Sequence, residues 1–527
     1  MKKKCLIISD NNKFDLGLLE ELIKNKEFNY DVNVIITLYE IDEYNEKKLP
    51  DIKKYSLNDI SLSYVKNFKD IIELDEDIIN KNSNSQLNHA KGLTFVTPDN
   101  TFTLNELRDE YFSDLKFVLN LLDEFKPDTV FFLNIPHDPK TLVLSQLCIN
   151  YKINQVVLRE TLPATFVLED AKREPFDNKP KIINKAELKP IIKDFISFKA
   201  FSNPLFQIFR NHTLVRNKIF SQNLIISFLI YFFYRFVSYL FCQFKNLIKT
   251  IIYIYIKTFK INIKINFNNP LFAYENWKKK KFKLAESKTN EFHFAHILFK
   301  EELKKFFYFR KYLKNCTKIV SNEKFIYFPL HFQPEATTIP YGNFFYDQIQ
   351  AIKLLSSHLD NNIKIFVKEH PDTFNLARHA WTRGTWGRDR HYYDDLLKIN
   401  NVQLLNLDST TDEVLDQCMF VATIAGTTAL QSVLKNKPSL IFGDAWFREC
   451  EGVHLAKNAK DIIKFLDNKI YEKGVEKDKV NSFFNNLNFN SFEASKTEIS
   501  LSNIEHEIQD ASAIIIKRIN EIENNII

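Results

Sequence analysis

The sequence predicts an α/β protein with two Rossmann-like, doubly wound domains, and three observations support this prediction. The chain of 527 residues is too long to fold around one hydrophobic core. Short apolar runs alternate with segments of helical spacing in the first and last thirds of the sequence, which favours parallel sheets. In the last third, three of these runs are followed by polar residues. We expect domains over 1–175 and 321–470, a linker with a helical insert over 176–320, and a helical tail over 471–527.

The first domain is predicted from a short series of strands and helices. The lysine-rich start precedes only a short apolar run, so we interpret it as a first strand and not as a signal peptide. Asp75 and Asp77 resemble a DxD metal motif, but an acidic solvated face is the commoner explanation, and no metal site is predicted. The expected strands are 4–9, 31–38, 127–134 and 155–158, and the expected helices are 104–125 and 142–151.

Composition narrows the class of protein. Hydrophobic residues make up 45% of the chain and charged residues 26%, as in an ordinary folded protein. The six cysteines are scattered without a CxxC pair, which indicates a reduced, cytoplasmic protein that lacks a disulfide framework and a zinc site. The net charge is +6, and its distribution along the chain is more informative than its size.

The predicted insert has an unusual charge pattern. Residues 195–274 contain no Asp or Glu but ten Lys or Arg side chains, interleaved with apolar aromatic runs. This combination suits the surface of an anionic membrane. The run 224–242 nearly reaches the length of a membrane span, but Arg235 lies at its centre, so we favour interfacial helices over a buried hairpin or a span. An ordinary helical insert is the other alternative. Nucleic acid is a poor partner, because the runs are too apolar.

The second domain is predicted from five strands that alternate with four helices. Two such domains that face each other across a cleft form the GT-B arrangement, which is common among sugar transferases. In order, the strands are 324–330, 363–368, 402–406, 419–424 and 439–442, and the helices are 344–358, 391–399, 411–417 and 427–435.

Nine candidate residues lie at the end of three of these strands or directly after it. Ligands of open α/β sheets bind beyond the carboxyl ends of the strands, so we expect these side chains to converge on one crevice. The strand 324–330 is followed by His331, Gln333 and Glu335. The strand 363–368 ends at Lys368 and is followed by His370 and Pro371. The strand 419–424 is followed by Gly426, Thr427 and Thr428.

Several of these residues have a chemical interpretation and a structural alternative, and His331 and Gln333 could simply be polar groups of the sheet edge. Gly426, Thr427 and Thr428 open a helix, where unpaired N–H groups and the helix dipole favour phosphate; a plain helix cap is the alternative. His370 could donate a hydrogen bond to a phosphate oxygen or protonate a leaving phosphate. The carboxylate of Glu335 could accept ribose hydroxyls or act as a base, or it could cap a loop.

These motifs resemble the capsule polysaccharide biosynthesis family. The matching segments are 327–338, 346–348, 367–371, 423–429, 436–438 and 442–447, with 126–128 and 134–138 in the first domain. The family is related to the Kdo transferases of capsule synthesis, which are GT-B enzymes that use CMP-activated acidic sugars. The resemblance implies that His370 and Pro371 contact the CMP phosphate and that Thr427 and Thr428 support it. The basic aromatic insert departs from the family pattern.

The resemblance implies a glycosyltransferase, and the basic aromatic insert places it at the inner face of the cytoplasmic membrane as a peripheral protein. It would transfer a sugar from a CMP-sugar such as CMP-Kdo to a lipid-linked glycan, with no cofactor and no metal. The acceptor would bind near His137 and Asp138, and Asp138 and Glu160 are the candidate bases or nucleophiles. Two alternatives remain: a GT-B enzyme such as a nucleotide-sugar 2-epimerase, and a non-catalytic export or assembly factor.

Overall fold

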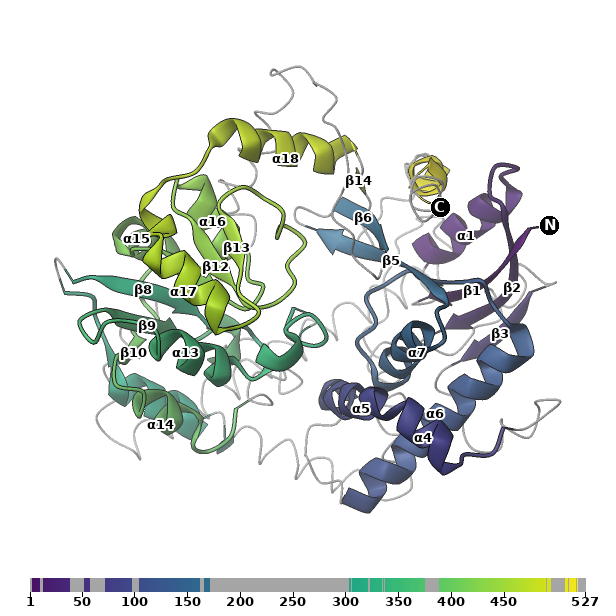
Figure 1. The fold of residues 1–527 in the computed structure, drawn as a ribbon, viewed down its shortest axis with the longest axis horizontal. Coiled ribbons are helices and arrows are strands. Elements are labelled where there is room, and N and C mark those ends of the chain that lie inside the picture. Colours follow the sequence, from purple (N-terminus) through teal and green to yellow (C-terminus); the bar gives the residue numbers. More distant parts are fainter. Residues whose placement is uncertain are drawn as a thin grey trace, which may run out of the picture.

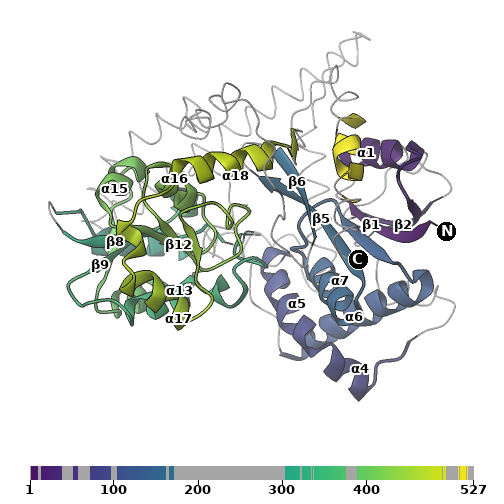
Figure 2. The same cartoon turned by 45° about the horizontal axis from the view of Figure 1, so that its top comes forward.

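The protein consists of two α/β domains that lie side by side in a computed structural model (Figures 1 and 2). This architecture confirms the predicted fold class of two Rossmann-like sheets in a GT-B arrangement. The basic aromatic insert predicted over 176–320 lies outside the described residues, except for its last part. The structure describes residues 2–9, 13–37, 52–56, 72–96, 104–161, 165–170, 303–304, 306–320, 323–333, 335, 337–374, 388–489, 491–493, 508–509, 511–517 and 519.

The N-terminal domain is built on a seven-stranded sheet of order β14-β6-β5-β4-β1-β2-β3. Strands β3, β2, β1, β4 and β5 run parallel, whereas β6 pairs antiparallel with β5 and β14 pairs antiparallel with β6. The order reverses between β1 and β4, which is where such sheets bind ligands. The strands are β1 Lys3–Ser9, β2 Tyr30–Thr37, β3 Lys53–Ser56, β4 Thr129–Phe132, β5 Asn154–Thr161, β6 Thr165–Asp170 and β14 Ser491–Glu493.

Helices cover both faces of this sheet. On one face, α6 and α7 pack their apolar sides onto the strands, while α4 and α5 lie against them. On the other face lie α1 and a helical segment near the end of the chain, whose Ile508, Ile515 and Ile519 join the same core as Leu18. These helices are α1 Lys13–Lys24, α4 Glu76–Lys81, α5 Ser83–Val96, α6 Leu104–Phe125 and α7 Pro139–Asn150.

The C-terminal domain holds a second sheet of seven strands, in the order β13-β12-β11-β8-β9-β10-β7, and all its strand pairs are parallel. Here the chain order reverses between β8 and β11. The strands are β7 Cys316–Thr317, β8 Phe325–Pro329, β9 Lys364–Lys368, β10 Val402–Leu405, β11 Val421–Thr423, β12 Ser439–Ile441 and β13 Val453–Leu455.

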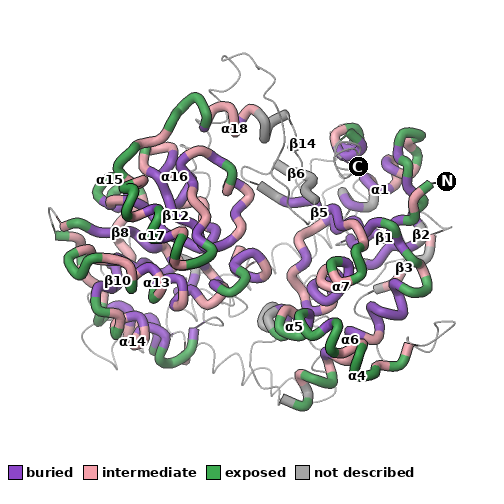
Figure 3. Tube along the Cα trace, viewed as in Figure 1, coloured by how far each residue is buried: buried purple, intermediate pink, exposed green. Residues whose placement is uncertain are grey.

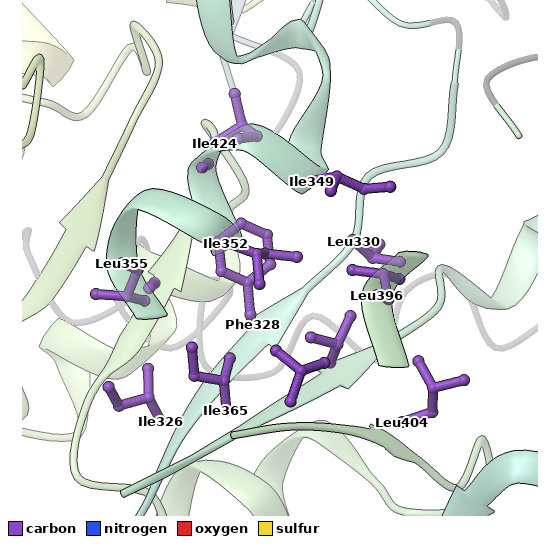
Figure 4. Close-up of a cluster of buried hydrophobic side chains, with 14 of the residues drawn as sticks. Ile326, Phe328, Leu330, Ile349, Ile352, Leu355, Ile365, Leu396, Leu404 and Ile424 are labelled. Carbon is purple, nitrogen blue, oxygen red and sulfur yellow. The ribbon is translucent and has the colours of Figure 1, made fainter. Parts of the chain in front are cut away.

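The core of this domain lies on both faces of the sheet, and its strands are buried almost throughout (Figure 3). Figure 4 shows one face, where Phe328 and Ile365 of the sheet pack against Ile352 and Leu355 of α13 and against Leu396 of α14. The opposite face is covered by α15, α16 and α18. The elements are η1 Asn343–Tyr346, α13 Gln348–Ser356, η2 Pro371–Phe374, α14 Tyr392–Leu397, α15 Thr411–Gln417, α16 Thr428–Leu434, α17 Ala459–Asp467, η3 Ile470–Glu472 and α18 Lys477–Phe489.

The observed domain limits differ from the predicted ones at two places. The second domain begins before residue 321, because the helix over 306–315 buries Phe306, Phe309 and Tyr312 in its core and β7 extends its sheet. The stretch expected to be a helical tail also contains β14, which crosses back to the N-terminal sheet. The helix predicted over 344–358 is divided into η1 and α13, because Asp347 is extended and caps α13 through its side chain.

Among the described residues, no helix is both long and apolar enough to cross a membrane.

Candidate active site

The candidate site lies at the carboxyl edge of the C-terminal sheet, where the strand order reverses. His331 follows β8, His370 follows β9, and Gly426 follows β11, so the three predicted segments end at one edge. A chain of hydrogen bonds then joins them directly. The structure therefore brings the three segments together, as the sequence predicts.

His331 is the centre of this chain of contacts. Its side chain is buried, and Nε2 accepts the N–H of Ala425 at 3.2 Å. Nε2 is therefore the unprotonated nitrogen, and Nδ1 carries the proton and faces the hydroxyl of Thr337 at 3.2 Å. Burial, together with the nearby charges of His370 and Arg388, lowers the pKa of His331 to about 3. A neutral ring thus links the loop after β8 to the loop after β11.

The link continues to a carboxylate. The hydroxyl of Thr337 donates to Oε2 of Glu335 at 3.2 Å, so His331, Thr337 and Glu335 form a relay of polar groups. Glu335 is half-buried, and its backbone carbonyl accepts the N–H groups of Thr338 and Ile339. The fold therefore fixes this carboxylate at the sheet edge.

A buried ion pair that the sequence did not reveal supports the same edge. Glu369 and Arg388 are 1% and 5% exposed, and Nε and Nη2 of Arg388 donate to the two carboxylate oxygens at 2.9 Å each. The carboxylate also accepts the hydroxyls of Tyr393 at 2.7 Å and Thr373 at 3.2 Å. Burial alone would raise the pKa of Glu369, but the charge and hydrogen bonds of Arg388 hold it below its ordinary value.

This ion pair holds the backbone on which the predicted residues lie. The carboxylate of Glu369 accepts the N–H of His370 at 2.8 Å. Arg388 donates to the carbonyl of His331 at 2.9 Å and to Oε1 of Gln333 at 2.7 Å. Glu369 and Arg388 thus set the position of both histidine backbones without themselves being exposed.

Two other predicted residues have structural contacts. Gln333 is buried and donates from Nε2 to the carbonyl of Tyr346 at 2.8 Å, in addition to its bond with Arg388. Lys368 is also buried, and its ammonium donates to the carbonyl of Ser409 in the loop before α15. Both therefore brace the site from within the domain.

Four other predicted residues of this edge are partly exposed. His370 is half-buried, and its ring lies beside Phe332 with 5.8 Å between centroids; Pro371 begins η2. Gly426, Thr427 and Thr428 are also half-buried, and Thr427 makes no side-chain cap on α16. A Cβ atom at Gly426 would lie 3.0 Å from the hydroxyl of Thr423 and 3.4 Å from the His331 ring, so glycine allows this close approach.

The predicted acceptor-side residues lie at the carboxyl edge of the N-terminal sheet, after β4. Asp138 caps α7: one oxygen accepts the N–H groups of Lys140 and Thr141, and the other accepts the Thr141 hydroxyl at 2.5 Å. Nδ1 of His137 lies 2.6 Å from the carbonyl of Ile135, which requires a proton on Nδ1. Glu160 belongs to β5, and its side chain lies outside the described residues.

The acidic cluster at Asp75 is a helix start. Its carboxylate accepts the N–H of Ile78 at 2.8 Å and caps α4, which accounts for the DxD-like pattern. In the described part of the chain, no group of three or more His, Cys, Asp or Glu side chains is placed to hold a metal ion.

Comparisons with known proteins agree with the predicted resemblance. Residues 310–472 match the family model described as capsule polysaccharide biosynthesis protein, and this segment contains every site residue of the C-terminal domain. No curated protein matches the chain.

Solved structures similar to the chain share little sequence with it. One is the UDP-GlcNAc 2-epimerase from Methanocaldococcus jannaschii, with 12% identity over 93% of this chain and 99% of that chain and a TM-score of 0.23. Another is the UDP-GlcNAc 2-epimerase from Neisseria meningitidis, with 12% identity over 98% of this chain and 100% of that chain and a TM-score of 0.21. A third is the N-terminal domain of trehalose-6-phosphate phosphatase from Candida albicans, with 10% identity over 100% of this chain and 98% of that chain and a TM-score of 0.26. Similarity at this level says nothing about the activity of this chain.

Proposed function

We propose, from the match of residues 310–472 to the capsule polysaccharide biosynthesis family, that the protein is a glycosyltransferase of surface polysaccharide synthesis. Its donor is a nucleotide sugar, and a CMP-sugar such as CMP-Kdo fits the resemblance best. Its acceptor is a lipid-linked glycan. The observation that supports this proposal most directly is the hydrogen-bonded junction of three strand ends at the switch point of the C-terminal sheet.

The donor would bind on the C-terminal domain. The hydroxyls of Thr427 and Thr428 and the close backbone at Gly426 suit the phosphate of the nucleotide, with neutral His331 directly behind the glycine. His370 would face the bond that breaks, and Glu335 would accept hydroxyls of the ribose or the sugar. Because Glu369 and Arg388 hold the backbones of His331 and His370, these two residues would need little rearrangement when charge develops.

The transfer exchanges one C–O bond for another. The acceptor hydroxyl oxygen forms a bond to the anomeric carbon, while the bond from that carbon to the phosphate oxygen breaks and its electron pair stays on CMP. The proton of the acceptor hydroxyl passes to a base. His370 would stabilise the negative charge on the departing phosphate. A single phosphate leaves, so we propose that turnover needs no metal and continues in EDTA.

On the acceptor side, we propose that His137 takes the proton in place of Asp138. The carboxylate of Asp138 accepts three donors of its own helix, whereas Nδ1 of His137 donates to the carbonyl of Ile135. Glu160 stays a prediction for a base or a nucleophile. His137→Ala should lower turnover without weakening nucleotide binding, and an unchanged turnover would remove it from the mechanism.

A thermal-shift comparison of CMP, UDP and GDP tests the donor class. A ligand at 100 times its dissociation constant stabilises the folded state by about 2.7 kcal/mol, so CMP should raise the melting temperature clearly more than the other two. The double substitution of Thr427 and Thr428 by Val should abolish the shift. A larger shift with UDP would support the epimerase alternative, and no shift with any nucleotide would support the assembly-factor alternative.

The predicted insert implies a place of action. Residues 195–274 lie outside the described residues, so we propose from the sequence that they bind the anionic inner face of the cytoplasmic membrane. The full chain should bind vesicles of anionic lipid, and salt should weaken binding. Substituting Gln for Lys245, Lys249, Lys257 and Lys260 should reduce binding. Binding that survives both changes would exclude an electrostatic attachment, and resistance to carbonate extraction would indicate an inserted segment.

A further inference from the structure

One arginine connects the N-terminal domain to the loops beside the candidate donor site. Arg159 lies in β5 at the carboxyl edge of the N-terminal sheet and is 4% exposed. Its Nη2 donates to the backbone carbonyl of Asp444 at 2.7 Å, and its guanidinium lies 4.1 Å from the centre of the Tyr341 ring. Both partners belong to the C-terminal domain.

The two loops that Arg159 contacts behave as one unit. The N–H of Asp444 donates to the carbonyl of Tyr341 at 2.8 Å, and that of Gly443 donates to the carbonyl of Ile424 at 2.7 Å. A Cβ atom at Gly443 would lie 2.8 Å from both Ile424 and the Tyr341 carbonyl, so the loops pack too tightly for a side chain there. The loop that carries Tyr341 continues directly from Thr337. The two loops therefore border the hydrogen-bonded groups of His331, Thr337 and Glu335.

A second contact reaches the same unit. Leu142 of α7 packs against Ile339 and Tyr346, which lie four and eleven positions after Glu335. The N-terminal domain therefore meets the C-terminal domain at both ends of the segment 339–346, and Arg159 supplies the polar part of this contact.

We propose that Arg159 is a positioning residue that docks the acceptor-side domain onto the donor-side loops. It would thereby set the gap that a sugar has to cross. The transfer part of this inference rests on the proposed function, whereas the docking itself does not. A guanidinium can donate in its plane while its flat face stacks on an aromatic ring, whereas an ammonium has no flat face to stack. Arg159→Lys should therefore restore only part of the contact.

The chain offers a matched control. Arg448 donates to the carboxylate of Asp444 at 3.1 Å, but this contact lies wholly within the C-terminal domain. Arg448→Ala removes an arginine from the same loop and leaves Arg159 and both its partners in place. A second pair of variants changes the C-terminal partner of Arg159. Tyr341→Leu removes the ring that the guanidinium covers, and Tyr341→Phe keeps that ring.

The experiment measures the distance between the domains in the full chain without ligand. Spin labels at Lys24→Cys and Lys398→Cys, whose native side chains are 65% and 73% exposed, report one domain each. Cys242 and Cys316 are replaced by Ser. Arg159→Ala should lengthen and broaden the distance distribution, Arg159→Lys should give an intermediate result, and Arg448→Ala should match the parent protein.

Turnover gives the second measurement. Loss of a hydrogen bond from a charged donor corresponds to about a tenfold effect or more, so Arg159→Ala should lower kcat/KM with a CMP-sugar by about tenfold, with less than about twofold for Arg448→Ala. If Arg159→Ala does not fold, Tyr341→Leu against Tyr341→Phe tests the same contact.

Equal distance distributions for Arg159→Ala and Arg448→Ala would overturn the docking role. Failure of every CMP-sugar as a donor would overturn the proposed function alone, because the distance measurement needs no substrate.

Discussion

The carboxyl edges of the two sheets use their charged residues differently. At the C-terminal edge, Glu369 and Arg388 are buried together and hold the backbone of both His331 and His370. At the N-terminal edge, Asp138 is half-buried and caps the helix that follows it. The first edge is held by a buried ion pair, and the second is a simpler helix start beside His137. This difference supports the proposed division, in which the first edge would bind the nucleotide phosphate and the second the acceptor hydroxyl.

The largest difference should come from the ion pair. Arg388→Met leaves the Glu369 carboxylate buried without its charged partner, so the free energy of unfolding should fall by about 3–5 kcal/mol. Urea denaturation measures this change. Lys398→Ala removes an exposed ion pair from the same domain and should leave stability nearly unchanged. A small loss for Arg388→Met would mean that the pair does not anchor this edge.

The next effect concerns catalysis. His370→Ala should lower turnover by about 10²–10³-fold, because the ring is proposed to stabilise charge that develops on CMP. The melting temperature should stay near that of the parent protein. His358→Ala, on the surface after α13, is the matched control and should keep full activity. Normal turnover in His370→Ala would make this histidine a turn residue only.

Acid should reveal the buried state of His331. Its pKa is about 3 in the folded protein and about 6.5 in an unfolded chain, so below pH 6.5 the unfolded chain binds more protons. Stability is fully present above pH 6.5 and is lost as the pH falls. Between pH 7 and pH 5 this one group should cost about 2 kcal/mol. Urea titrations at both pH values should show a smaller loss in His331→Gln, and equal losses would argue against a buried neutral ring.

The smallest effect belongs to the N-terminal edge. Asp138→Ala removes the cap of α7 and should cost about 1 kcal/mol of stability, whereas Asp138→Ser should retain most of the cap. Thermal unfolding of the two variants measures this. If Asp138 only caps, Asp138→Ser should keep its turnover. Loss of turnover in Asp138→Ser at normal stability would instead restore this carboxylate as a catalytic candidate.

The sequence predicted the strands that carry the site because their apolar runs are continuous. For example, α6 and α15 were predicted with the observed bounds, and β8, β9 and β11 lie within their predicted ranges. The convergence of His331, His370 and Gly426 followed from the parallel order of the strands alone. Short elements such as β14 were missed, because three residues show no periodicity and the pairing with β6 is set by distant parts of the chain.

The ion pair could not be found in the same way. Glu369 lies within a recognised segment, but four arginines, Arg378, Arg383, Arg388 and Arg390, follow it within a short stretch. Periodicity does not distinguish among them, since that stretch has no regular spacing. A buried carboxylate requires a cation, so the burial of Glu369 would have predicted a basic partner. It would not have predicted which of the arginines is that partner.

The N-terminal domain is completed by residues from the far end of the sequence. Gly17 of α1 leaves room for Ile508, whose side chain would lie 2.6 Å from a Cβ atom there, and β14 adds the outermost strand beside β6. During synthesis on the ribosome, this domain therefore leaves part of one apolar face uncovered while the whole C-terminal domain emerges. We expect the C-terminal domain to reach protease resistance first, although it is made second. Limited proteolysis of stalled nascent chains of increasing length would show the opposite order if the N-terminal domain matures alone.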